Sequence, residues 1–269
     1  MSDGVSLSLT DSGETTPVVL LHGLTATRRY VVMGSRALER SDHRVIAYDA
    51  RGHGRSSPAP DPSAYGYEEL GRDLEAVLDS LGIERAVLAG ASMGAHTILW
   101  LALRAPERVG GLVVITPGYD PETQDDPARL ARWDALADGL ESGGVEGFIA
   151  AYGEPDVPER WRDTVTTVIR QRMALHEHPE AVAQALRAVP RSRPFGALNE
   201  LGAISGFPVT VVASGDEADP GHPQALAEAY AAAIPGARLL TDEPGTSPLA
   251  WQGSQLSRVI AEVAAEARG

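Results

Sequence analysis

Short apolar segments alternate with longer amphipathic segments along most of this chain, and that alternation narrows the folds it can adopt. Most of the apolar segments are hydrophobic almost throughout, as strands buried on both faces of a parallel sheet must be. The amphipathic segments carry apolar residues at helical spacing, with residues 67–82 the clearest case. Alternating strands and helices predict a doubly wound, mostly parallel α/β sheet with helices on both faces. The predicted strands are 17–23, 44–52, 85–92, 109–118, 208–216 and 237–243.

The alternation is interrupted between residues 119 and 201. That stretch contains helical patterns near 127–140, 158–175 and 179–188, separated by prolines and glycines, and no convincing strand. A helical insertion between two strands is most simply a lid over one end of the sheet. We therefore predict an α/β core made of residues 1–118 and 202–269 and a helical cap made of residues 119–201.

The composition excludes several classes of chemistry. The 269 residues include no cysteine, which rules out disulfides, thiol nucleophiles and thiolate metal sites. All 23 basic residues are arginine, so a lysine Schiff base is also excluded. The net charge of −14 disfavours nucleic acid and anionic membranes as partners. We expect a small-molecule substrate or ligand instead.

The targeting signals that the sequence lacks point to a cytoplasmic location. No apolar run approaches the roughly 18–20 residues that span a bilayer. The segment "MSDGVSLSLTDSGE" has no basic region followed by an apolar core, which a secretory signal requires. The cytoplasm is the expected compartment, and oligomeric state cannot be read from the sequence.

The segment "LAGASMGAHTILWLAL" carries the strongest chemical signal. It runs from a buried strand through Gly90-Ala91-Ser92-Met93-Gly94 into a helix. A sharp turn between strand and helix strains the serine backbone and leaves its hydroxyl exposed at the carboxyl edge of the sheet. Side chains at the two glycine positions would collide with the neighbouring strand and helix. This pattern predicts that Ser92 is a nucleophile; the alternative is a serine that caps a helix.

A second turn complements Ser92. The strand "PVVLLHG" ends at His22-Gly23, so the backbone N–H of Leu24 is expected to point at the space above Ser92. The N–H of Met93 at the start of the following helix is expected to point at the same place. Two converging N–H groups would hold the negative charge of a tetrahedral intermediate. We therefore predict an oxyanion hole formed by Leu24 and Met93.

With these motifs in place, the chain resembles the α/β-hydrolase family over nearly its whole length. The resemblance implies an eight-stranded type of sheet, a variable helical cap, and a serine, an acid and a histidine in that chain order. It implies no cofactor and no metal. The matching segments are "HG" at 22–23, "DARGHGRS" at 49–56, "GASMG" at 90–94, "APERVGGLVVITP" at 105–117 and "SGDEADPGHP" at 214–223.

The resemblance places the acid in the loop after the strand that follows the cap. That loop contains Asp216, Glu217 and Asp219. The family spacing favours Asp219, with Asp216 as the second candidate. The alternative for all three is an acidic residue near a helix N-terminus.

The resemblance fails where the histidine should be. The family delivers it directly after the last strand, but this chain has Thr246 there, in "PGTSP". A threonine hydroxyl is not a useful base near neutral pH. We expect Thr246 at the edge of the substrate pocket, near Ser92 and Asp219, in the space that an imidazole would fill.

His222 is the best substitute base, because it lies three residues beyond Asp219 in the same loop. The alternative for His222 is an ordinary surface histidine. The other histidines have simpler explanations. We expect His22, His53 and His96 to be structural, His43 to end a surface helix, and His176 and His178 to face either the substrate or solvent.

Three hypotheses follow for the function. The first is a serine hydrolase of small esters or related acyl substrates with an atypical or degraded triad. The second is a protein that binds a small ligand under its cap without fast turnover. The third is a cofactor-free lyase or other non-hydrolytic enzyme that uses the oxyanion hole. The first is preferred because Ser92, its glycines and an acid are all present.

Overall fold

A single mixed sheet runs through the core of the computed structural model, which describes residues 4–215, 217, 219–242, 251 and 253–268. Its strand order is β1-β3-β2-β4-β5-β6-β7, and every neighbouring pair except β1 with β3 is parallel. The strands are β1 (Leu9–Ser12), β2 (Thr16–Leu21), β3 (His43–Tyr48), β4 (Ala86–Ala91), β5 (Val109–Ile115), β6 (Val209–Ala213) and β7 (Arg238–Thr241). The prediction of a doubly wound, mostly parallel sheet is confirmed.

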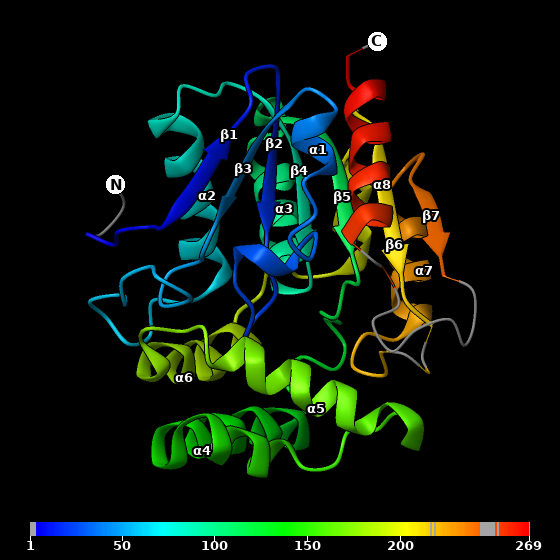
Figure 1. The fold of residues 1–269 in the computed structure, drawn as a ribbon. Helices are drawn as coiled ribbons and strands as arrows, with labels where there is room; N and C mark the ends of the chain where they lie inside the picture. Colours follow the sequence, from blue (N-terminus) through cyan, green and yellow to red (C-terminus); the bar gives the residue numbers. More distant parts are fainter. Residues whose placement is uncertain (1–3, 216, 218, 243–250, 252, 269) are drawn as a thin grey trace.

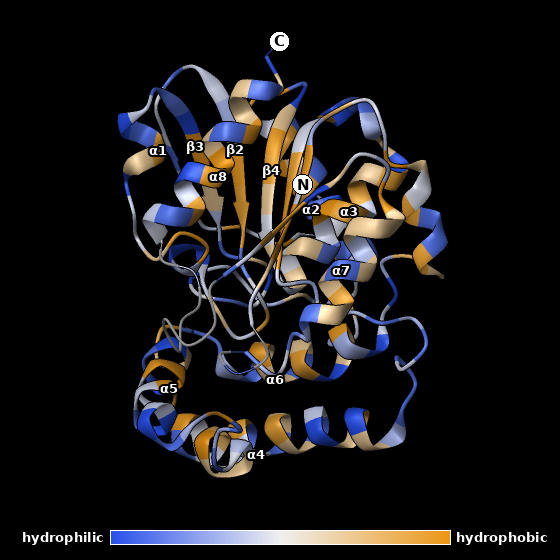
Figure 2. Cartoon of the chain, turned by 90° about the vertical axis from the view of Figure 1, so that its right-hand side faces the viewer, coloured by the Kyte–Doolittle hydropathy of each residue, from blue (hydrophilic) through white to orange (hydrophobic). Residues whose placement is uncertain are grey.

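Helices cover both faces of this sheet (Figure 1). The longer ones around the core are α2 (Tyr67–Ser80), α3 (Met93–Arg104), α7 (Gln224–Ala233) and α8 (Gly253–Glu266); α1 (Ala37–Arg40) is a single turn. Alternate residues of each strand enter two separate apolar clusters. Val19 and Leu21 pack with α2 and α3, whereas Val18 and Leu20 pack with α1 and α8. Because both faces are buried, strands such as β2 and β4 are mostly hydrophobic along their length (Figure 2).

The sheet differs from the eight-stranded type that the family resemblance implies. Its described part has seven strands, and the first of them, β1, is an antiparallel edge strand absent from the predicted list. Residues before β1 bond to the loop that follows β3: the amides of Ser6 and Ser8 donate to the hydroxyls of Ser57 and Ser56. The backbone of this segment is therefore satisfied by a loop and not by another strand.

Three helices lie together beyond one end of the sheet (Figure 1). They are α4 (Pro127–Tyr152), α5 (Glu159–Met173) and α6 (Pro179–Ala188), and no strand occurs between Ile115 and Val209. They enclose a third apolar cluster that includes Leu136, Phe148 and Leu186. The arrangement supports our interpretation of residues 119–201 as a cap, which stays a prediction as a division into domains.

Helix α4 is longer than the sequence pattern predicted. Helical structure was expected near 127–140, but it extends to Tyr152 through a non-helical residue, Gly144, with φ 59° and ψ −145°. The chain doubles back there. A Cβ added to Gly147 would lie 2.1 Å from the carbonyl oxygen of Gly139. The two halves of α4 thus touch backbone to backbone, which only glycines at these positions permit.

Within the described part of the chain, no helix combines the length and the apolar character needed to cross a membrane.

Candidate active site

The turn at Ser92 has the strained geometry that its sequence suggested. Ser92 has φ 50° and ψ −112°, its N–H donates to the carbonyl of Ile115 at 3.0 Å, and α3 begins at the next residue. A Cβ on Gly90 would lie 2.3 Å from the backbone of Gly94, and a Cβ on Gly94 would lie 2.2 Å from the carbonyl oxygen of Leu21. The two glycines let β4 and α3 meet at a sharp angle, which leaves the Ser92 hydroxyl at the carboxyl edge of the sheet.

His222 lies between Ser92 and Asp219 in an unbroken line of hydrogen bonds. Its Nε2 is 2.8 Å from the Ser92 hydroxyl oxygen, and its Nδ1 is 2.8 Å from a carboxylate oxygen of Asp219. The loop between β6 and α7 supplies both residues. That loop is held by its own turn, since the His222 amide donates to the Asp219 carbonyl at 3.0 Å. A serine, an imidazole and a carboxylate at these distances can activate the serine oxygen.

Of the remaining candidates from this region, only Glu217 lies among the described residues. Glu217 forms an ion pair with Arg160 on α5, at 2.9 Å. Asp216 and Thr246 lie outside the described residues, so the expected position of Thr246 beside Ser92 and Asp219 stays a prediction.

The His222 ring is seated against a turn that the sequence analysis did not single out. A Cβ on Gly118 would lie 2.8 Å from Cδ2 of His222, so the ring depends on the absence of a side chain there. The amides of Gly118 and Tyr119 both donate to Nε2 of His96, each at 3.1 Å. Nδ1 of His96 then carries the proton and faces the Tyr67 hydroxyl at 3.0 Å. His96 therefore anchors the turn on which His222 rests.

The Leu24 amide is oriented by the residue before Gly23. Nδ1–H of His22 donates to the Gly23 carbonyl at 2.8 Å, and the Ala26 amide donates to the same oxygen at 3.0 Å. Because a trans peptide is planar, the N–H of Leu24 points away from that carbonyl. Gly23 lies against Ser92, since a Cβ added to it would be 3.3 Å from the Ser92 Cβ.

Met93 supplies the second predicted donor. It is the first residue of α3, so its N–H has no partner within the helix. Among the described residues, no backbone hydrogen bond is formed by the N–H of Leu24 or of Met93 outside regular elements. Both amides are therefore available to an oxyanion beside Ser92, and their role stays a prediction.

Three buried histidines support the Leu24 turn. The rings of His22 and His53 lie 5.3 Å apart, and those of His53 and His176 lie 5.5 Å apart. His176 comes from the segment between α5 and α6. It accepts a hydrogen bond from the Gly54 amide at 2.9 Å and faces the Thr25 carbonyl with Nε2 at 3.1 Å. This histidine joins the helical insertion to the turn that contains Leu24.

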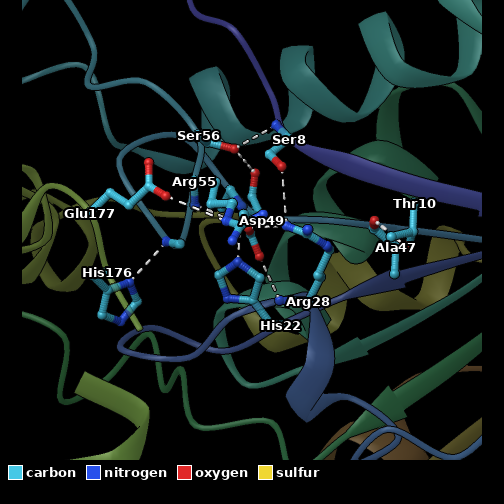
Figure 3. Close-up of polar contacts among 12 residues, drawn as sticks. Ser8, Thr10, His22, Arg28, Ala47, Asp49, Arg55, Ser56, His176 and Glu177 are labelled. Atoms are coloured by element: carbon cyan, nitrogen blue, oxygen red, sulfur yellow. Dashed lines mark hydrogen bonds and ion pairs between the residues drawn. The ribbon is translucent and has the colours of Figure 1, made fainter. Parts of the chain in front are cut away.

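Asp49, directly after β3, fixes the loop that surrounds these histidines (Figure 3). Its carboxylate accepts from the amides of Arg28 at 2.8 Å and Arg55 at 3.1 Å, and it forms an ion pair with the Arg28 side chain. Its carbonyl accepts from the Ser56 hydroxyl at 2.6 Å. A single carboxylate thus ties the turns after β2 and β3 together.

Burial keeps the structural histidines neutral. It lowers the pKa of His22, His96 and His176 to about 3, because a charged imidazole loses its hydration in these positions. Each ring can then accept a backbone N–H with one nitrogen. These histidines act as hydrogen-bonding braces, as expected for His22 and His96.

Two expectations about histidines were wrong. His176 faces neither the substrate nor solvent, because it is 8% exposed and both its ring nitrogens face backbone groups. His43 is not at the end of a surface helix: it is the first residue of β3 and is 3% exposed. The preceding helix α1 ends at Arg40, and the turn after it leads directly into the sheet. His178 is partly exposed and lies 3.6 Å from Glu180.

Sequence reasoning missed Gly118 and the anchoring role of His96. Gly118 was assigned to the end of a strand, and only the glycine itself, directly after an apolar run, hinted at a close approach. In the part of the chain that is described, no three His, Cys, Asp or Glu side chains gather in a way that could hold a metal ion.

Comparison with known proteins agrees with the fold. A family model described as alpha/beta hydrolase fold matches residues 16–245. The chain is 39% identical over 113 residues to sn-1-specific diacylglycerol lipase ABHD11 of Mus musculus, which covers 41% of this chain and 36% of that protein. It is 30% identical over 149 residues to 3-oxoadipate enol-lactonase 1 of Acinetobacter baylyi, covering 55% and 53%.

The aligned segments thus span about half or less of the length of these curated relatives. A solved structure of a thermophilic esterase from Thermogutta terrifontis is similar over almost the entire chain. It shares 27% identity at a TM-score of 0.79, covering 98% of this chain and 95% of that one. The family match over most of its length, together with the fold, shows that this chain belongs to the α/β-hydrolase family.

Proposed function

We propose that the protein hydrolyses small esters or related acyl substrates, with Ser92 as nucleophile, His222 as general base and Asp219 as the acid that orients His222. The observation that carries this proposal is the line of two 2.8 Å hydrogen bonds from Ser92 through His222 to Asp219. The strained turn at Ser92 adds support, because such strain is typical of a nucleophile held at the edge of the sheet.

The proposed reaction follows from these contacts. Nε2 of His222 takes the proton of the Ser92 hydroxyl as its oxygen attacks the ester carbonyl carbon. The N–H groups of Leu24 and Met93 stabilise the resulting oxyanion. His222 then gives the proton to the leaving alcohol, and an acyl-enzyme remains. A water molecule, deprotonated by His222, releases the acid and regenerates Ser92.

In this proposal the base comes from an unusual position in the chain. The family resemblance implies a histidine after the last strand, but there the chain has Thr246. His222, in the loop after β6, lies at the proper distance from both Ser92 and Asp219. We therefore interpret the triad as rearranged: one loop provides both the acid and the base.

The test is the turnover of a short neutral ester by wild type, Ser92→Ala and His222→Ala. We expect Ser92→Ala and His222→Ala each to lower kcat by about 10³-fold or more, since members of a triad act together. Added imidazole should restore part of the activity of His222→Ala but none of that of Ser92→Ala. Equal turnover by wild type and His222→Ala would remove His222 as the base.

The ligand-binding and non-hydrolytic hypotheses predict different results in this assay. Under either, wild type turns over no ester of any chain length, and Ser92 is not modified by a serine-directed phosphonate. The hydrogen-bonded Ser92–His222 pair argues against simple ligand binding, which requires no base in contact with this serine; ester turnover then separates hydrolysis from non-hydrolytic chemistry.

A further inference from the structure

Arg172, near the end of α5, is a cation that has no bonded anion among the residues that the structure describes. Other arginines of the helical insertion are paired with carboxylates: Arg170 with Glu146 at 2.7 Å, and Arg191 with Asp134 at 2.7 Å. For Arg172, no ion pair or side-chain hydrogen bond exists to any part of the chain that the structure describes, and its Nε is buried without a partner. A buried donor left unpaired costs free energy, which an incoming ligand can recover.

Helix geometry turns Arg172 toward the core. Residues two apart on an α-helix lie about 200° apart around its axis. Arg170 reaches Glu146 on α4, and α5 lies between α4 and the sheet (Figure 1). Arg172 therefore projects from the opposite side of α5, toward the carboxyl edge of the sheet.

Electrostatic interactions and the packing of the next residue indicate that Arg172 lies on the side of the candidate site. Its charge acts on Asp219, and it also acts on His22 and His176, which flank the turn of Leu24. The next residue, Met173, belongs to the apolar cluster against which Leu24 packs. Arg172 is thus close both to the acid of the proposed triad and to the predicted oxyanion turn.

The net negative charge of the chain makes a cation without a bonded anion notable as a candidate binding group for an anionic ligand. With a net charge of −14, the protein repels anions at long range. Burial lowers the pKa of Arg172 from its ordinary value, as expected when a cation leaves water without a bonded anion. A carboxylate that docks against the guanidinium fork would form two charge-assisted hydrogen bonds and offset this cost.

We propose that Arg172 binds a carboxylate group of the substrate, so that the preferred substrates are esters or lactones that carry a second, free carboxylate. This inference rests on the proposed hydrolase function and narrows its substrate class. Arg172 does not take part in proton transfer: it holds the anionic end of the substrate while Ser92 attacks the ester carbonyl at the other end.

Binding is tested without turnover by titrating glutarate into the protein and measuring the heat released. We expect saturable binding by wild type and a loss of affinity of about tenfold or more in Arg172→Met, the amount expected for a lost charged hydrogen bond. Arg170→Met is the matched control, because Arg170 lies on the same helix and faces away, and its affinity for glutarate should equal that of wild type. Equal binding by Arg172→Met and wild type would overturn the proposal.

Specificity is tested with monomethyl glutarate and dimethyl glutarate, which differ by one charge. We expect the ratio of kcat/KM for the monoanion to that for the diester to fall about tenfold or more in Arg172→Met, to be partly kept in Arg172→Lys, and to be unchanged in Arg170→Met. An equal loss on both esters would assign Arg172 to the electrostatics of Asp219 and would overturn carboxylate recognition.

Failure of this inference is distinguishable from failure of the proposed function. If wild type hydrolyses the diester through Ser92 but shows no preference for the monoanion and no glutarate binding, the hydrolase proposal stands and carboxylate recognition is wrong. If neither ester is hydrolysed while glutarate still binds through Arg172, carboxylate binding stands and hydrolysis is wrong.

Discussion

Gly118 shows how one missing side chain determines the position of a functional group. The His222 ring occupies the place that a Gly118 Cβ would crowd, at 2.8 Å from Cδ2. The Gly118 turn cannot easily retreat, because His96 holds two of its amides and the Thr116 amide donates to Val212 at 2.8 Å. Any displacement must therefore occur at His222.

Gly118→Ala should lower kcat for a neutral ester by about tenfold or more, because a shift of the imidazole by a fraction of an ångström spoils its contact with Ser92. The protein should stay folded. Gly143→Ala is the control: a Cβ there meets nothing within 4 Å, so kcat should not change. The proposed position of His222 would be contradicted if Gly118→Ala had the kcat of wild type.

Thr246 gives a second prediction about the base. Since His222 already contacts both Ser92 and Asp219, Thr246→His should not raise ester turnover and is expected to lower it, because two imidazoles would compete for one serine. In a His222→Ala background the same change should restore activity, provided that position 246 occupies the expected histidine place. The kcat values of the single and double variants measure both effects; a large gain from Thr246→His alone would mean that His222 is a poor base.

At the scale of elements, the sequence predicted most of what periodicity and turn chemistry control. The six parallel strands, the helix before β4 and the turn at Ser92 follow from apolar runs and glycine spacing. The antiparallel strand β1 was missed because it is short and partly exposed, with little apolar pattern. Edge strands of that kind are specified by their pairing partner more than by their own residues.

The sequence predicted only part of the candidate site, because some of its residues depend on neighbours that are distant in the sequence. Ser92 was assigned from a local pattern, Asp219 from the family resemblance, and His222 was proposed from its distance along the chain from Asp219. Gly118 lies against His222, about 100 positions away, and Arg172 lies within electrostatic range of Asp219, about 50 positions away. A single sequence contains no periodic signal for such contacts.

The hairpin within α4 makes the cap sensitive to its glycines. A Cβ at Gly147 would lie 2.1 Å from the carbonyl oxygen of Gly139, so Gly147→Ala should separate the two halves of α4 and loosen the packing of Phe148. We expect faster amide hydrogen exchange across α4, with exchange in α3 unchanged. Gly143→Ala again serves as the control, and equal α4 protection in both variants would show that the hairpin tolerates the added methyl group.

For the molecule as a whole, the buried histidines predict a loss of stability in mild acid. The pKa of His22, His96 and His176 is about 3 in the folded protein and about 6.5 in an unfolded chain. Between these values the unfolded chain binds more protons, so the free energy of unfolding falls as pH drops below about 6.5. Each such histidine contributes up to about 1.4 kcal/mol per pH unit.

The linkage is measured by urea unfolding at pH 7.5 and pH 5.0. Wild type should be less stable at pH 5.0, and His176→Asn should lose less stability between the two pH values, even though it starts from a lower value because two backbone contacts are lost. His178→Asn, at the partly exposed neighbouring histidine, should follow wild type. An identical pH effect in wild type and His176→Asn would contradict the assigned role of this histidine.

The triad at Ser92 is best examined through the rate at which a serine-directed fluorophosphonate modifies the protein, followed by intact mass and peptide mapping. We expect one adduct per chain, located on Ser92, and a rate at least about 10²-fold slower in His222→Ala, because the serine is then without its base. An adduct elsewhere, or modification of His222→Ala at the wild-type rate, would contradict the assignment of Ser92, His222 and Asp219 as the working triad.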